Sequence, residues 1–266
     1  MLVLPYGYLL TFAQTHPMKK LILTCLSGML LSGAAKAQLS YGPELGVNLS
    51  NYRVEFPGFF PPTTLPIPGA HVGGIVNYRF SDHLAIEPGA FFSINGIKYT
   101  YNLYILGSIT AVAHLNTIRI PVNVNYTFGE PGGNRFFVGA GPFFGINLGG
   151  SARATANTSF PMADSFLLAA VGTTDSAQKI TAGNDSSDYI KRFDFGVGVN
   201  VGYQLSNGLF FRAGYTRGLL NMSPTASGQT SAIHSINYAL SVGYYFGDRP
   251  KKKMKAKMNA PKKKTH

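Results

Sequence analysis

The sequence predicts an all-β protein, an eight-stranded antiparallel up-and-down transmembrane β-barrel. Three observations predict this fold class. Between Arg192 and Phe211, large apolar side chains occupy every second position, and mostly glycine and amide side chains fill the positions between them. Six further segments alternate in a similar way, and the links that join the strands are short and long in turn. An apolar leader at the start of the chain is typical of export.

Alternation with a period of two indicates a strand with two unlike faces. In a soluble sandwich, the polar face would carry Lys, Glu and Thr toward water. In the segment 192–211, that face is rich in glycine, asparagine and glutamine. This composition suits a crowded polar interior with the apolar face turned toward lipid. A soluble lipocalin-like barrel would place the apolar face inside instead.

The leader predicts a signal peptide over residues 1–37. Met18 is the expected true start, and a short basic segment begins there. An apolar run follows, and the A-x-A cleavage pattern Ala35–Ala37 ends the leader. The apolar run of about 11 residues is too short to cross a bilayer of ~30 Å as a helix. Cys25 is the single cysteine and lies inside the leader, so we expect neither disulfides nor cysteine metal ligands in the mature chain.

The formal net charge of +12 is concentrated at the two ends of the chain. The leader carries three lysines and no acid, and residues 248–266 carry a net charge of eight, which leaves about +1 for residues 38–247. Nucleic-acid binding requires a basic folded surface, so we expect no nucleic-acid partner. Like charges and prolines predict a disordered periplasmic tail over 248–266. Its main basic residues are Lys251, Lys252, Lys253, Lys262, Lys263 and Lys264.

The predicted strands together form one barrel domain over residues 38–247. In chain order they are 41–50, 70–80, 84–96, 115–128, 135–148, 192–204, 209–219 and 234–247. Each sets an apolar face against a face of glycine, amide, hydroxyl or charged side chains. Closure into a ring leaves no unpaired strand edge in lipid. An even strand count places both ends of the barrel on one side of the membrane.

The links between the predicted strands alternate in length. Short, turn-rich links are expected at 81–83, 130–134 and 206–208, and longer ones at about 51–69, 97–113, 149–190 and 220–233. In barrels of the bacterial outer membrane, short turns face the periplasm and long loops face outward. Tyrosines near strand ends are expected to form interfacial aromatic girdles: Tyr78, Tyr126, Tyr203 and Tyr244.

Strand parity places charged side chains on the inner face of the barrel. The predicted lumen cluster is Glu44, Arg79, Glu87, Arg119 and Arg212, and Arg135 and Asp194 are expected nearer the rims. An arginine at the lipid midplane costs about 2–4 kcal/mol, whereas inside the barrel it can pair with a carboxylate. Because a barrel of this size is just wide enough to be filled by its own side chains, we predict a closed, salt-bridged lumen.

The loops and the few histidines are the remaining candidate sites. Phe56, Phe59 and Phe60 stand in a proline-rich loop and predict either a docking surface or a lid over the barrel mouth. His71 and His114 are expected near the outer rim, without the spacing of metal ligands. The adjacent pair His234-Ser235 points to opposite faces, so it cannot act as a base and a nucleophile. We therefore predict no enzymatic activity, no metal and no cofactor.

Several segments resemble a known family. Tyr41–Ser50, Leu115–Val122, Leu209–Tyr215 and Tyr244–Phe246 are similar, in order and spacing, to the PorT-like outer-membrane β-barrel family over about residues 40–247. The resemblance implies an outer-membrane location and no shared catalytic residues. It implies a structural, docking or binding role at the cell envelope, which in some relatives is accessory to a secretion system.

The expected partners follow from this placement. They are outer-membrane lipid, an envelope or secretion-system protein and, through the tail, the cell-wall polymer, and the barrel itself is expected to be a monomer. Two alternatives stay open: a narrow porin-like channel for small solutes, and a lipid-modifying outer-membrane enzyme.

Overall fold

A computed structural model describes residues 38–55, 63–102, 107–157, 177–183, 185, 188–224 and 232–247. The predicted signal peptide, with its start at Met18, and the predicted tail over 248–266 lie outside these residues. The strands are β1 (Gln38–Glu55), β2 (Thr63–Arg79), β3 (Leu84–Asn102), β4 (Ser108–Phe128), β5 (Arg135–Asn157), β6 (Gln178–Ile180), β7 (Phe193–Gln204), β8 (Leu209–Gly218) and β9 (Ala232–Tyr244). Among the described residues, no helix is long and apolar enough to cross a membrane.

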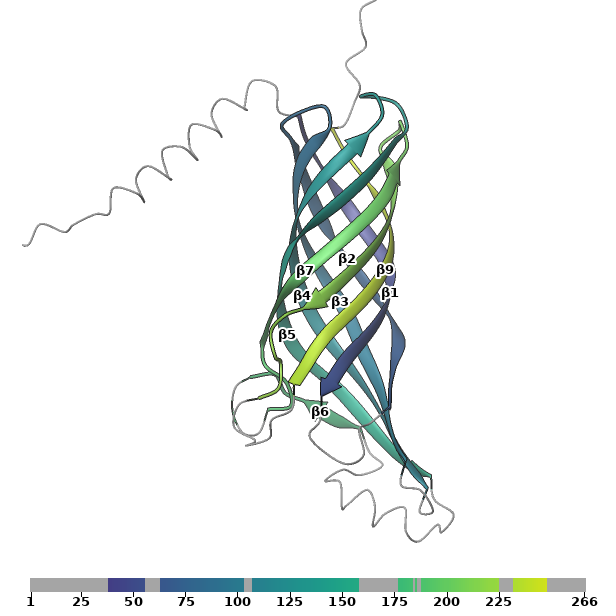
Figure 1. Ribbon diagram of the computed structural model, residues 1–266, viewed down its shortest axis with the longest axis vertical. Coiled ribbons are helices and arrows are strands. Elements are labelled where there is room, and N and C mark those ends of the chain that lie inside the picture. Colours follow the sequence, from purple (N-terminus) through teal and green to yellow (C-terminus); the bar gives the residue numbers. More distant parts are fainter. Residues whose placement is uncertain are drawn as a thin grey trace, which may run out of the picture. The chain divides into compact units, whose positions relative to one another are not determined.

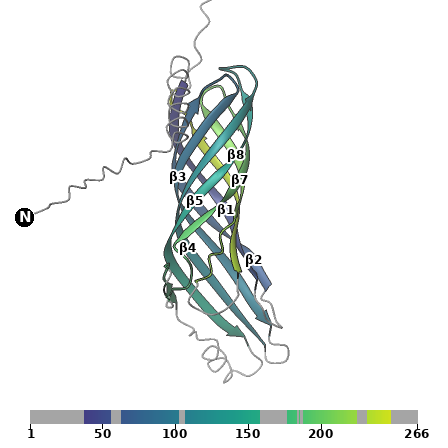
Figure 2. The same ribbon diagram turned by 60° about the vertical axis from the view of Figure 1, so that its left-hand side comes forward.

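The strands form a closed antiparallel barrel. Each of β1 to β5 pairs with the next, β5 then pairs with β7, and β7, β8 and β9 continue the ring. β9 pairs back onto β1 from Glu44↔Gly243 to Glu55↔Ala232, which closes it. Figures 1 and 2 show these strands inclined around the barrel. The predicted fold class is confirmed, and the short β6 is an addition that pairs only with β5.

The two faces of the strands point as predicted. On β7, the alternating apolar side chains from Phe193 to Tyr203 are between 39 and 56 % exposed. Asp194 and Gln204, on the other face of the same strand, are buried. In water such exposure of apolar side chains would be unfavourable, so this outer surface is suited to lipid. The glycine and amide face lines the lumen.

Aromatic side chains gather on the outer surface at two levels. At the end with the short turns, Tyr126 packs edge-on against Phe128 with ring centroids 4.8 Å apart, and Tyr244 packs against Phe246 at 4.9 Å. Toward the other end, Phe144 stacks on a neighbouring strand's ring at 5.6 Å. The eight residue steps from Phe136 to Phe144 span ~20 Å at ~3.3 Å per step and a strand tilt near 40°. This spacing is close to the apolar thickness of an outer membrane.

The turn between β7 and β8 is one of three short connections at the same end of the barrel. Its backbone is held by a bond from Leu205 N to Leu209 O at 2.7 Å and one from Gly208 N to Leu205 O at 3.0 Å. Gly208 has φ of 99°, a conformation that favours glycine, and Asn207 Oδ1 accepts from Leu209 N at 3.0 Å. The bridge Tyr41↔Phe246 places both ends of the barrel on this side.

The outer ends of β1 to β5 are longer than predicted. β4 has 21 residues and β5 has 23, although about 9–11 suffice to cross the hydrocarbon. Most of the predicted loops 51–69 and 97–113 is therefore strand, and the link at 103–107 is no longer than the turn at 129–134. The predicted alternation of link lengths is wrong at this position. Outside lipid, the pairing from Gly96↔His114 to Asn102↔Ser108 requires no apolar face, so hydropathy does not reveal it.

Candidate functional site

In the part of the lumen nearer the short turns, three side chains from three strands form an ion cluster. Arg212 of β8 bonds Glu44 of β1, with Nη1 3.1 Å from Oε2, and Glu87 of β3, with Nη2 2.6 Å from Oε1. The exposed fractions are 8, 3 and 1 %, so all three charges are removed from water. One guanidinium thus joins strands on different sides of the ring. We call these three residues the ion cluster.

Polar neighbours form hydrogen bonds with the second carboxylate oxygen of Glu87, Oε2. The hydroxyl of Tyr245 donates to Glu87 Oε2 and accepts from Arg212 Nη2 at 3.3 Å. Asn77 Nδ2 donates to the same carboxylate oxygen at 3.2 Å. A buried ion pair compensates its desolvation only when further hydrogen bonds complete it. These contacts meet that condition for Glu87.

Aromatic rings enclose the ion cluster. The Arg212 guanidinium carbon lies 5.1 Å from the ring centre of Phe210 and 5.5 Å from that of Phe137, within the range of cation–π attraction. Phe210 also stacks on Tyr245 at 4.5 Å. Together with Ile75 and Phe91 these rings form one buried hydrophobic cluster. We call this cluster of Ile75, Phe91, Phe137, Phe210 and Tyr245 the aromatic floor.

The aromatic floor was missed by the sequence analysis, although the sequence carries a sign of it. Four aromatic doublets stand in the strands and a fifth at the end of β9, and alternation turns one member of each doublet inward. The outward members were predicted; they are 37 to 51 % exposed, whereas their inward neighbours are at most 8 % exposed. The doublets are Phe91-Phe92, Phe136-Phe137, Phe143-Phe144, Phe210-Phe211 and Tyr244-Tyr245.

Arg119 lies in the lumen but outside the ion cluster. Its Nη1 donates to Thr216 Oγ1 at 3.1 Å, and its guanidinium carbon lies 4.7 Å above the ring centre of Phe143. The carboxylate of Asp194 accepts a hydrogen bond from Ser235 Oγ at 2.7 Å instead. In the part of the chain that the structure describes, no carboxylate forms an ion pair with Arg119. The prediction of a salt-bridged lumen therefore describes Arg212 and not Arg119.

The other predicted lumen charges lie closer to the ends. Arg79 is buried at the last position of β2, near the short turns. Arg135 is 2 % exposed and donates from Nη2 to Gln204 Oε1 at 3.3 Å. Asp194 is 3 % exposed. The expectation that Arg135 and Asp194 sit in water at the rims is wrong, because both side chains turn inward and form hydrogen bonds with side chains of other strands.

A cavity of about 100 Å³ lies in the lumen beside the ion cluster. Its lining includes Glu44, His71, Arg119, Asn123, Asn200, Arg212, Thr216, Asn237 and Ser241. His71 Nε2 lies 3.1 Å from Ser241 Oγ. The prediction that His71 lies at the outer rim is wrong, because β2 begins at Thr63 and carries this residue to mid-barrel. We call this cavity the chamber.

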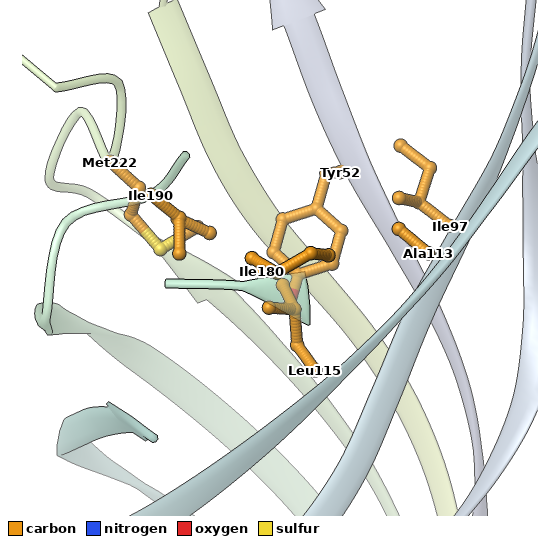
Figure 3. Packing of buried hydrophobic residues seen from close by; sticks show 7 residues of the cluster. All are labelled: Tyr52, Ile97, Ala113, Leu115, Ile180, Ile190 and Met222. Carbon is orange, nitrogen blue, oxygen red and sulfur yellow. The ribbon is translucent and has the colours of Figure 1, made fainter. Parts of the chain in front are cut away.

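A hydrophobic plug fills the outer end of the lumen (Figure 3). Its buried members are Tyr52, Ile97, Ala113, Leu115, Ile180, Ile190 and Met222. Ile180 comes from β6, and Ile190 and Met222 come from the segments that precede β7 and follow β8. The connections at the outer end thus turn their apolar side chains back into the barrel. We call these seven residues the outer plug.

Asn147 of β5 fixes the outer plug to the barrel wall. Its backbone N donates to Arg192 O at 2.7 Å, and its Nδ2 donates to Lys191 O at 2.9 Å. Its Oδ1 accepts from Thr117 Oγ1 at 3.1 Å. Lys191 N in turn donates to Met222 O at 2.8 Å, which joins the two plug segments.

The remaining predicted sites fall into two groups. Phe56, Phe59 and Phe60, and the tail residues Lys251, Lys252, Lys253, Lys262, Lys263 and Lys264, lie outside the described residues. His114 is exposed on β4, within the strand and not at its start. Ser235 points inward to Asp194, and no contact joins it to a histidine among the residues described. No group of three potential metal ligands occurs among those residues either.

Comparison with known proteins identifies the type of barrel. The model of the family described as "Outer membrane protein beta-barrel domain" matches residues 12–223. No curated protein is matched by the sequence.

Solved structures of outer-membrane barrels are also similar. Ail, the attachment invasion locus protein of Yersinia pestis, is 11% identical, with 79% of this chain and 99% of that chain covered and a TM-score of 0.36. OprG from Pseudomonas aeruginosa is 12% identical, with 79% and 95% covered and a TM-score of 0.40. Neisserial surface protein A is 12% identical, with 77% and 97% covered and a TM-score of 0.34.

The ion cluster predicts a strong and specific stability effect. Arg212→Gln leaves two carboxylates buried without a cation, which we expect to cost roughly 3–5 kcal/mol of unfolding free energy. Urea unfolding of the barrel refolded in lipid vesicles measures this loss. Arg217→Gln is the matched control, because Arg217 is exposed on the outer face of the same strand. Equal losses of unfolding free energy in the two variants would contradict a stabilising role of the ion cluster.

The inward rings predict which lumen glycines tolerate a methyl group. A Cβ at Gly202 would overlap the Phe137 ring and the Phe211 carbonyl, whereas at Gly214 the nearest atom is 3.8 Å away. We expect Gly202→Ala to cost about 1–3 kcal/mol, as overpacking does. Gly214→Ala should change stability by no more than about 0.5 kcal/mol. The same urea titration compares them, and equal tolerance at both positions would show that the lumen is loosely packed.

Proposed function

This chain belongs to the outer membrane protein beta-barrel domain family, and we propose that within that family it is a sealed barrel that serves as a docking scaffold. Its place is the outer membrane. The observation that carries the proposal is the filling of the lumen at two levels. The ion cluster and the aromatic floor occupy the end with the short turns, and the outer plug occupies the opposite end.

A filled lumen argues against solute transfer as the main task. A solute or hydrated ion would have to displace Phe210 and Tyr245, which are at most 4 % exposed, and break the pairs of Arg212. It would then meet the apolar side chains of the outer plug, which repel water. The chamber between them holds only about 100 Å³. A narrow porin-like channel is the second candidate, and only the chamber favours it.

Docking is the task that a sealed barrel leaves available. The strands β4 and β5 continue well past the length that the hydrocarbon requires, so they raise the outer connections above the lipid. The proposed partners are an envelope or secretion-system protein on the exposed parts and the cell-wall polymer on the tail. The likeness to PorT-like proteins supports an accessory role in secretion. The proposal also includes that the barrel is a monomer.

The proposal also assigns no enzymatic activity. Ser235 donates to Asp194, and Ser241, which lies beside His71, lines the chamber in the lumen. A lipid substrate in the membrane reaches neither hydroxyl without entering the lumen. The alternative of a lipid-modifying enzyme is therefore the less supported one.

The sealed lumen predicts that the barrel conducts no ions in electrical recordings. Purified protein in planar bilayers should give no steady conductance, because no continuous water path crosses the two filled levels. A variant with Arg119→Ala, Arg212→Ala and Tyr245→Ala, which removes three lumen side chains, and with Ile180→Ser and Ile190→Ser in the outer plug, is the positive control and should conduct. Large, steady conductance from the unmodified protein would overturn the proposal in favour of a channel.

The docking role predicts that a partner depends on the exposed parts of the chain. Capture from envelope extracts should differ between the full chain and two variants, one lacking residues 248–266 and one with Phe56, Phe59 and Phe60 replaced by Ser. The expected result is loss of one captured protein or polymer with one variant and its retention with the other. Capture that is unaffected by both changes would contradict the proposed surfaces.

A further inference from the structure

Four basic side chains lie together on the outward face of the barrel near its outer end. Three of them stand one position from a member of the outer plug, and the fourth stands one position from Ala152, which packs against the plug. Because neighbouring residues of a strand point to opposite faces, all four side chains turn away from the lumen. They are Lys98 of β3, His114 of β4, Arg153 of β5 and Lys179 of β6. We call these four residues the basic patch.

The strand register brings the members of the basic patch close to one another. His114 faces Ser151, and Ser151 faces Lys179, so one row crosses β4, β5 and β6. In the next row outward, Val112 faces Lys98 on one side and Arg153 on the other. Two strand spacings of ~4.8 Å separate the ends of each row, so the basic patch is about 10 Å wide.

The basic patch has no acidic neighbours on its strands. The outer parts of β3 to β6, residues 93–102, 108–118, 146–157 and 178–180, contain neither Asp nor Glu. In the described part of the chain, no carboxylate forms an ion pair with any of the four side chains. Lys98, Arg153 and Lys179 therefore give this surface a concentrated positive charge that attracts anions.

The basic patch lies just beyond the outward apolar side chains that face lipid, which we call the apolar belt. On β3 the belt ends at Ile94, four residues before Lys98. On β4 Ile118 belongs to the belt and stands four residues from His114. Four residue steps of a strand inclined near 40° rise ~10 Å. The polar layer of a bilayer adds about 5–8 Å on each side of the hydrocarbon, so long basic side chains at this height reach the headgroups.

We propose that the basic patch binds the phosphate groups of the lipid in the outward leaflet, a phosphorylated glycolipid of the lipopolysaccharide class. The exposed belt residues Phe92, Ile94 and Leu148 lie below the patch, so a lipid whose acyl chains cover them places its headgroup against the basic side chains. Clusters of Lys and Arg beside the hydrocarbon are typical of anionic-lipid recognition, and their donors pair strongly with phosphate. This inference is independent of the lumen and of the docking role, and its failure would leave both as described.

The test titrates the full mature chain, refolded in detergent micelles, with two forms of purified lipopolysaccharide. One form is intact, and the other has lost its phosphates to enzymatic hydrolysis. Native mass spectrometry measures how much lipid is bound. The intact form should bind about 100-fold more tightly, at roughly fivefold for each Lys or Arg near the phosphates. Dextran sulfate, a soluble acidic polysaccharide without acyl chains, should not displace it.

A variant and a matched control separate the basic patch from the net charge of the chain. The patch variant carries Lys98→Gln, Arg153→Gln and Lys179→Gln, and it should bind the two forms of the lipid with nearly equal affinity. The control loses the same three charges from the tail, through Lys251→Gln, Lys252→Gln and Lys253→Gln, and it should keep the preference for the intact form.

The outcomes decide the proposal even if a variant does not fold. The comparison of the two forms of the lipid needs only the unmodified chain, and heat-modifiable gel mobility shows whether each variant is folded. Equal affinities of the unmodified chain for the two forms would overturn the proposal. So would an equal loss of preference in the two variants, or displacement of the lipid by dextran sulfate, which would indicate an acidic polysaccharide as the occupant.

Discussion

The contact between Arg212 and the carboxylates of Glu44 and Glu87 is the interaction on which the rest of the structure depends. It joins β8, β1 and β3, which meet in this geometry only when the ring is closed. Outside the barrel, the same strands expose apolar side chains that need lipid. These three charged side chains therefore fit only in the lumen, and the lumen forms only when the ring closes. The arrangement makes the lumen a polar core held inside an apolar wall.

The lumen is packed in the manner of a protein interior. Inward rings such as Phe137 and Phe210 fill the space that inner-face glycines on neighbouring strands leave open. The same wall thus needs both residue types, since a side chain at Gly202 or Gly243 would occupy the position of a ring. Where neither kind of residue fills the barrel, the chamber remains, with Arg119 beside it. Packing, more than barrel width, closes this lumen.

The sequence predicted the barrel well because lipid imposes a strict two-residue period on the strands. It placed Glu44, Glu87 and Arg212 on one inner face, but parity alone does not say which charges meet across a ring. Arg119 was expected to pair with a carboxylate but donates to Thr216, and the Asp194 carboxylate accepts from Ser235. The outer plug was not predicted, since Ile180 and Met222 come from irregular segments without a period. The outer strand extensions escaped prediction for the same reason.

The central claim is that Arg212 is locked between two carboxylates in the interior of the barrel. Nuclear magnetic resonance of the barrel with isotopically labelled arginine side chains tests it most directly. A locked guanidinium rotates slowly about its C–N bonds, so the Arg212 Nη–H groups should give separate resonances that exchange slowly with water. A single averaged Nη resonance for Arg212, exchanging rapidly with water, would contradict the account.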